Sequence, residues 1–230
     1  MRQKIILGIW ISIWLAGWVS ASGSASYRVD RAGEVSASDV PSAMKELLQA
    51  DGVRLLDANG KALFEIWLRL PMVTKVGAYT PSDVLYGTLE KGAWLGVLHC
   101  PSGGTDFRGQ AIPPGYYSMR YQHIRQDGNH MGVSLYRDFA LLVPALVDTN
   151  INAPLNFAEV VKLSARVSGT NHPAILSLAT PSEGKTAARP AVTQDDLGHW
   201  VVETSSQIKD QGGPQAEFSF AIILVGQAEF

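Results

Sequence analysis

Short apolar runs in which every second residue is hydrophobic recur along most of the chain after residue 52, separated by turn residues. This alternation predicts half-buried β-strands. The dipeptide Asn59-Gly60 lies between two such runs and favours a β-hairpin, because both residues tolerate a positive φ angle. Strands are expected at 53–57, 62–69, 84–89, 93–99, 116–124, 139–143, 174–178, 200–204 and 217–225.

Only two segments favour helices. The first is short, at 41–48, with Asp39 and Pro41 as start signals. The second covers 156–169, where Asn156 and Glu159 have the spacing of a capping box. A parallel sheet would need a helix after nearly every strand, so the sequence predicts a mainly β fold: an antiparallel β-sandwich, jelly-roll-like, with one or two short helices.

The N-terminus has the pattern of a secretory signal peptide over residues 1–21. Arg2 and Lys4 precede an uncharged stretch at 5–18, and small residues follow up to Ala21. The apolar stretch is too short for a hydrocarbon core of ~30 Å, which favours cleavage over anchoring. We therefore expect a bacterial protein that is exported to the periplasm or the medium, soluble after cleavage and without a membrane span. A flexible lead-in is expected at 22–38 and a single domain at 39–230.

Composition narrows the range of functions. Hydrophobic residues make up 46% of the chain and charged residues 17%, below the roughly 25% of ordinary globular proteins, so a large core is expected. A formal net charge of −2 gives no electrostatic footprint for nucleic acid. The single cysteine, Cys100, excludes an internal disulfide and any multi-cysteine zinc site.

The segment between His99 and Asp138 is unusually polar and contains glycine-rich loops, which often carry ligand-binding residues. The strand expected at 116–124 should present two faces. The face expected to be half-buried carries Tyr117, Met119, Tyr121 and His123. The face expected to meet solvent or a polar groove carries Tyr116, Ser118, Arg120 and Gln122. The candidate ligand-binding residues are Asp106, Arg108, Arg120, His123, Asp127, Asn129, His130, Arg137 and Asp138.

Three stretches of this segment carry a family resemblance: 106–120, 127–132 and 137–139. The run Pro113-Pro114-Gly115-Tyr116-Tyr117, which enters an expected strand, resembles a segment of exported bacterial β-sandwich proteins of unknown function. The resemblance covers about a third of the chain. It implies the sandwich fold and carries over no activity, cofactor or catalytic residue.

Several chemistries remain open for this segment. His123 and His130 are candidate metal ligands, although their spacing matches no strong metal-binding template. Cys100 is either a buried strand residue or a thiol nucleophile paired with a histidine. Asp106, Asp127 and Asp138 could supply the paired carboxylates of a glycosidase. The catalytic residues stay unknown.

Aromatic side chains near polar groups could instead stack on sugar rings. The aromatic candidates are Tyr86, Trp94, Tyr116, Tyr117, Tyr121 and Tyr136. The hypothesis favoured by the sequence is a module that binds a small molecule or glycan, or a structural interaction module. The alternative is a metal-dependent or carbohydrate-active enzyme that uses the polar rim at 106–138. No cofactor is predicted for the binding module, whereas the enzyme alternative includes a divalent metal. The loop at 127–130 is expected to be part of the site.

Overall fold

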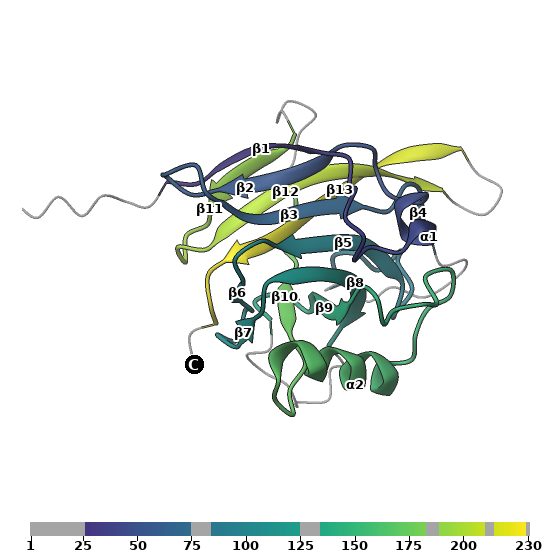
Figure 1. Cartoon of the computed structure of the whole chain (residues 1–230). Helices are drawn as coiled ribbons and strands as arrows, with labels where there is room; N and C mark the ends of the chain where they lie inside the picture. The colour runs from purple at the N-terminus through teal and green to yellow at the C-terminus, as the bar shows by residue number, and fades with distance from the viewer. Residues whose placement is uncertain (1–25, 75–83, 125–133, 183–188, 210–213, 229–230) are drawn as a thin grey trace, which may run out of the picture.

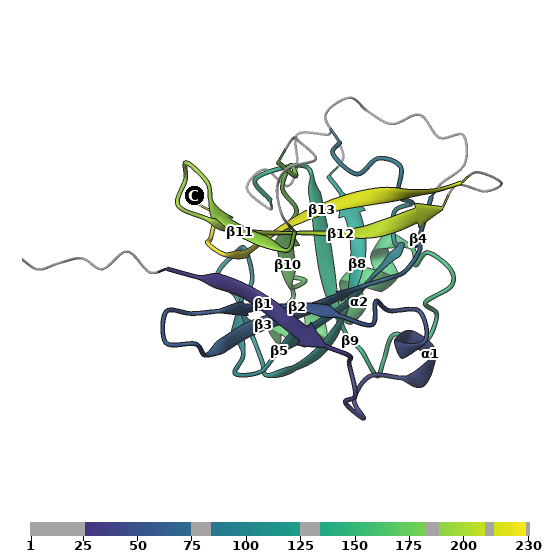
Figure 2. The same ribbon diagram turned by 90° about the horizontal axis from the view of Figure 1, so that it is seen from above.

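Two antiparallel sheets pack face to face as a β-sandwich, which confirms the predicted fold class (Figures 1 and 2). The computed structural model describes residues 26–74, 84–124, 134–182, 189–209 and 214–228. The predicted leader therefore lies outside the described residues. The larger sheet has the strand order β1 (Arg28–Gly33), β2 (Gly52–Leu56), β3 (Ala62–Leu68), β5 (Trp94–Cys100), β8 (Gly115–His123), β9 (Asp138–Pro144) and β10 (Ile175–Ser177).

The smaller sheet is built around a long hairpin, and a short strand extends it in parallel. Its strands are β11 (Ala191–Gln194), β12 (Trp200–Lys209), β13 (Gln215–Val225) and β4 (Met72–Val73). A two-stranded ribbon stands apart and consists of β6 (Gly104–Thr105) and β7 (Ala111–Ile112). The helices are α1 (Ser42–Lys45) and α2 (Phe157–Ser168), and neither has the length and apolar character that crossing a membrane requires.

The main core lies between the two sheets. On β8, Met119 and Tyr121 point into this core, where they join Phe220 and Ile222 of β13. Side chains alternate between the two faces of a strand. Ser118, Arg120 and Gln122 of β8 therefore point away from this core, toward the side of the sheet on which α2 lies. In Figure 1, α2 lies on the side of the larger sheet that faces away from β12 and β13.

Local sequence signals account for several of these elements. Gly60, with φ of 81°, turns the chain between β2 and β3, as the Asn-Gly pattern predicts. At the start of α2, Asn156 Oδ1 accepts a hydrogen bond of 2.9 Å from the Glu159 backbone, which confirms the capping box. The start signal assigned to Asp39 is wrong, because α1 begins after Pro41 without a side-chain cap.

The sequence also led to errors, each with a physical reason. The segment 84–89 forms turns instead of a strand, because the Asp138 carboxylate accepts hydrogen bonds from the backbone of Leu85 and Tyr86. Strand β1 occupies part of the expected lead-in. It is an exposed edge strand that pairs with β2 alone, so its sequence lacks the apolar alternation of a covered strand.

The face of β8 that was expected to meet solvent or a polar groove carries Tyr116, Ser118, Arg120 and Gln122. Tyr116 is partly buried and the other three are buried, so the solvent-facing alternative is wrong, whereas Gln122 lines a cavity. All five N–H groups of the Arg120 guanidinium have an acceptor. Two of the bonds reach the buried Asp148 carboxylate, with Nε 2.7 Å from Oδ2, and three reach backbone carbonyls. The Ser118 hydroxyl donates to the same carboxylate. The pair fastens the segment that leads into α2 to the sheet.

Removing one partner of the buried Arg120–Asp148 pair should lower the free energy of unfolding far more than removing one partner of an exposed ion pair. We expect Asp148→Asn to lower the free energy of unfolding by about 3–5 kcal/mol, because Arg120 would keep a buried charge without a counter-charge. Urea titration measures this. The control is Arg31→Ala, whose side chain is 81% exposed beside Asp51 and should contribute less than about 1 kcal/mol. Similar losses in both variants would contradict the structural role of the pair.

Candidate ligand-binding pocket

The structure gives Asp106 and Asp138, two of the candidate site residues, local partners inside the protein. Asp106 is buried and accepts four hydrogen bonds, from the backbone of Arg108, Gln110 and Ile175 and from the Gln110 amide. Asp138 is buried and accepts from the backbone of Leu85 and Tyr86 and from the Tyr121 hydroxyl at 2.6 Å. Both carboxylates therefore hold loops against the sheet.

The remaining candidates are distributed over several places. Arg137 donates from its guanidinium to the carbonyl of Ile124, 3.1 Å from Nε. Arg120 lies in the buried ion pair with Asp148. Asp127, Asn129 and His130, together with the predicted site loop, lie outside the described residues. Among the candidates that the structure describes, only Arg108 and His123 line a common cavity.

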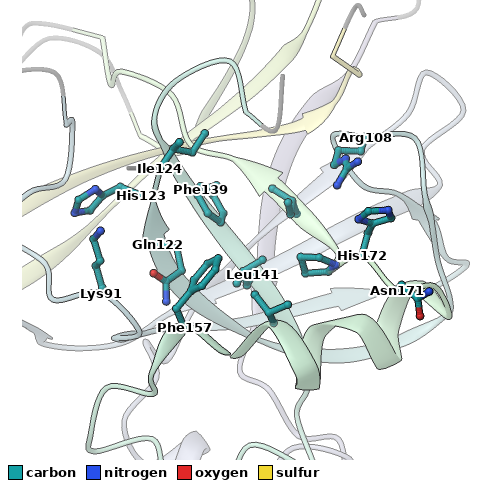
Figure 3. Close-up of a pocket in the computed structure, with 13 residues that line it drawn as sticks. Lys91, Arg108, Gln122, His123, Ile124, Phe139, Leu141, Phe157, Asn171 and His172 are labelled. Atoms are coloured by element: carbon teal, nitrogen blue, oxygen red, sulfur yellow. The ribbon is translucent and has the colours of Figure 1, made fainter. Parts of the chain in front are cut away.

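That cavity, here called the α2 pocket, lies between α2 and the outer face of the larger sheet (Figure 3). Its volume is about 300 Å³, at the lower end of the range for small-molecule sites. The buried side chains of Phe139, Leu141 and Ile175 contribute its apolar lining on the sheet side. Phe157 and Val161 line it from the first turns of α2, and Phe157 remains 53% exposed.

Polar residues gather at the two ends of the α2 pocket. Figure 3 shows Lys91, Gln122 and His123 on one side of the apolar residues, with Arg108, Asn171 and His172 on the other. None of the described residues that line the pocket is an aspartate or a glutamate. The charged groups that line it are therefore cationic, within the part of the chain that the structure describes.

Gln122 is the most unusual residue of the α2 pocket. The whole residue is only 1% exposed, yet its side-chain Nε2 has no hydrogen-bond partner. Nδ1 of the neighbouring His123 is likewise buried without a partner. Burial and the nearby Lys91 ammonium lower the pKa of His123 below its usual value, so its imidazole is neutral at pH 7. Two residues that line this end of the pocket therefore each carry a buried nitrogen without a hydrogen-bond partner.

The other end of the α2 pocket is held in place by a clasp of hydrogen bonds centred on Gln110. Its amide nitrogen donates to the carbonyl of Pro173 at 3.0 Å, and its amide oxygen accepts from the Thr170 hydroxyl at 2.8 Å. The Asp106 carboxylate fixes the backbone of the same turn. Two loops far apart in sequence therefore present Arg108 and His172 to one cavity.

Sequence reasoning missed most of this pocket. Gln122 and Phe157 were assigned to a strand face and to a helix, and no pattern links them, because their proximity depends on how α2 crosses the sheet. The sequence offered one signal: Phe157 is a large apolar residue in the first turn of a capped helix. In the structure the Phe157 side chain is half exposed.

The structure also shows where the residues of the metal-site and sugar-stacking hypotheses lie. Among the described residues, no three His, Cys, Asp or Glu side chains come together as a potential metal site. His99 lies on the outer face of the sheet, where its ring stacks on Tyr116 at 3.9 Å and its Nδ1 is 2.8 Å from a Glu65 carboxylate oxygen. Four of the aromatic candidates for sugar stacking are buried: Tyr86, Trp94, Tyr117 and Tyr121.

Comparison of the chain with family models, with curated proteins and with solved structures finds no match. The resemblance seen in the sequence therefore stays a prediction, and the argument for function depends on the pocket itself.

Cys100 should behave as an inert core residue. Its side chain is fully buried, and burial raises the pKa of its thiol to about 12. A protonated, inaccessible thiol is a poor nucleophile. We expect a disulfide reagent to label native protein at least about a hundred times more slowly than urea-unfolded protein. Rapid labelling of the native protein would restore the thiol-nucleophile hypothesis.

The unpaired amide of Gln122 makes an unusual prediction about stability. A buried donor without a partner costs about 1–3 kcal/mol, so Gln122→Met should raise the free energy of unfolding of the ligand-free protein by about 1 kcal/mol. The matched control is Ser118→Ala on the same buried face of β8, which removes a satisfied hydrogen bond and should lower it by a similar amount. Urea titration compares the two. Destabilisation by Gln122→Met would indicate that the amide has a structural partner.

Proposed function

We propose that this protein binds a small organic anion with an apolar body in the α2 pocket. The observation that carries the proposal is the buried Gln122 Nε2 donor, which has no hydrogen-bond partner and belongs to a residue that lines a cavity with apolar walls. A buried donor of this kind is unfavourable unless it donates a hydrogen bond, and an acceptor on a ligand would take one.

The charge of the surroundings supports an anion over a cation. Lys91 and Arg108 contribute the charged side chains among the described lining residues, and both are positive. Apolar walls lower the local dielectric response, so these charges act more strongly on a bound ligand than they would in open water. A carboxylate at the Gln122 end would accept a hydrogen bond from the Gln122 amide and face the Lys91 ammonium.

The apolar lining supports the rest of the ligand. Phe139, Leu141 and Ile175 present hydrocarbon and aromatic surface, and Phe157 would lose much of its exposure on binding. Burial of apolar surface contributes roughly 25 cal/mol per Å², which favours an alkyl or aromatic body. A sugar would leave many hydroxyls without partners against such walls, so the glycan hypothesis has less support here.

We place binding, not catalysis, in this pocket. Its described lining holds no cysteine, serine or carboxylate, so the acid–base groups that it offers are Lys91, His123 and His172. Export remains the prediction of the leader sequence, and it would put such a binding protein in contact with small molecules outside the cytoplasm.

The test uses two probes of equal length and opposite charge, octanoate and octylammonium, titrated calorimetrically into the full chain. We expect octanoate to bind at least about ten times more tightly. Val161→Trp should abolish octanoate binding by filling the pocket. Ala158→Trp adds the same side chain to an exposed position of α2 and should leave binding unchanged.

Two results would overturn the proposal: no octanoate binding by the folded wild-type protein, or unchanged affinity in Val161→Trp. Circular dichroism checks that each variant is folded. Val161→Phe is the smaller replacement to use if the tryptophan is not accommodated, and it should weaken octanoate binding in the same direction.

A further inference from the structure

A ligand with one anionic group at the Gln122 end of the α2 pocket would leave the Arg108 guanidinium at the other end without a partner (Figure 3). This guanidinium forms no hydrogen bond or ion pair with any residue in the described part of the chain, and it lies at the end of the α2 pocket remote from Gln122. The nearest carboxylate in sequence, Asp106, already accepts four hydrogen bonds from other donors. Among the described residues, no carboxylate therefore forms an ion pair with the Arg108 guanidinium.

The structure also fixes this arginine in a defined place. Asp106 accepts from the Arg108 backbone N–H at 2.9 Å, and Gln110 ties the same turn to the 170–173 loop. His172 and Asn171, which line the pocket beside Arg108, belong to that loop. A guanidinium on an anchored turn loses less conformational freedom on binding than one on a loose loop would. This end of the pocket has the features of a second anion-binding end.

We propose that the ligand of the α2 pocket carries an anionic group at each end of an apolar spacer, as an α,ω-dicarboxylate does. This inference rests on the proposed function and extends it. One carboxylate lies at the Gln122, His123 and Lys91 end. The other meets Arg108, whose planar guanidinium can donate two parallel hydrogen bonds to a carboxylate. The spacer packs on Phe139, Leu141 and Phe157.

Charge complementarity selects this class of ligand. A neutral alcohol would bring no negative charge to Arg108, and a monocarboxylate would place its charge at only one end of the pocket. A diacid pairs both, and its two charges stay apart because the polar residues lie on opposite sides of the apolar lining (Figure 3). The length of the spacer then matters, since both ends must be reached together.

The experiment compares octanedioate with octanoate, and then hexanedioate, octanedioate and decanedioate with one another, by calorimetry on the full chain. We expect octanedioate to bind at least about ten times more tightly than octanoate, because each charge-assisted hydrogen bond adds to affinity. Affinity among the diacids should pass through a maximum at one length. A steady rise with length would reflect apolar burial alone and would overturn the two-ended assignment.

Variants separate the two ends. Arg108→Gln should reduce the affinity for octanedioate to that for octanoate, while octanoate itself changes less than about threefold. Arg166→Gln is the control, since it removes an equal charge from an exposed position on α2 that does not line the pocket. Equal affinity of the wild type for octanoate and octanedioate would overturn this inference and leave the proposed function intact. Binding of neither probe would remove both.

Discussion

The structure depends on the burial of a polar strand face. Ser118, Arg120 and Gln122 follow one another on the side of β8 that turns away from the sandwich core, and α2 and the segment before it cover all three. Every donor on this face needs an acceptor, because water is excluded. Arg120 meets the requirement completely: Asp148 and three carbonyl groups take its five N–H groups. The position of the covering segment follows from those bonds.

The same requirement explains why a pocket forms where it does. Beyond Arg120, α2 packs on the sheet through Val160 and Val167, whereas Phe157 and Val161 border a cavity instead of filling it. Gln122 lies at that cavity, and its Nε2 lacks the partner that the arrangement gives to Arg120. Gln122 Nε2 is thus an unpaired donor on a buried face of β8 where the donors of Ser118 and Arg120 all have acceptors. The proposed binding of an anionic ligand would give that exception a physical reason.

Much of the fold could be predicted from the sequence because its signals are local. The Asn59-Gly60 hairpin and the cap at Asn156 each depend on residues adjacent in the chain, and both are present. The alternation along β8 predicted which residues enter the core. It could not predict that the opposite face is covered, because most of the partners of Ser118 and Arg120 lie in the segment before α2, 28–33 residues further along the chain. Edge strands such as β1 lacked apolar alternation and were missed.

The candidate site was predicted less well, for a related reason. Polar residues between His99 and Asp138 attracted attention as a group, but Asp106 and Asp138 turned out to bind backbone N–H groups and fasten loops. A carboxylate that anchors a loop and one that binds a ligand look the same in a sequence. Arg108 and His123, two of the candidate ligand-binding residues, line a common cavity, and their role in binding stays a prediction. Their common pocket arises from the clasp at Gln110 and the packing of α2, which are tertiary contacts.

The most direct test of the account is the NMR signal of the Gln122 side-chain amide, assigned by its absence in Gln122→Met. In the ligand-free protein the account predicts amide protons that are not protected by a hydrogen bond. Addition of octanoate should shift them and slow their exchange with water. Amide protons already protected before ligand is added, or unmoved when octanoate is bound, would contradict the claim that Gln122 offers its donor to a ligand.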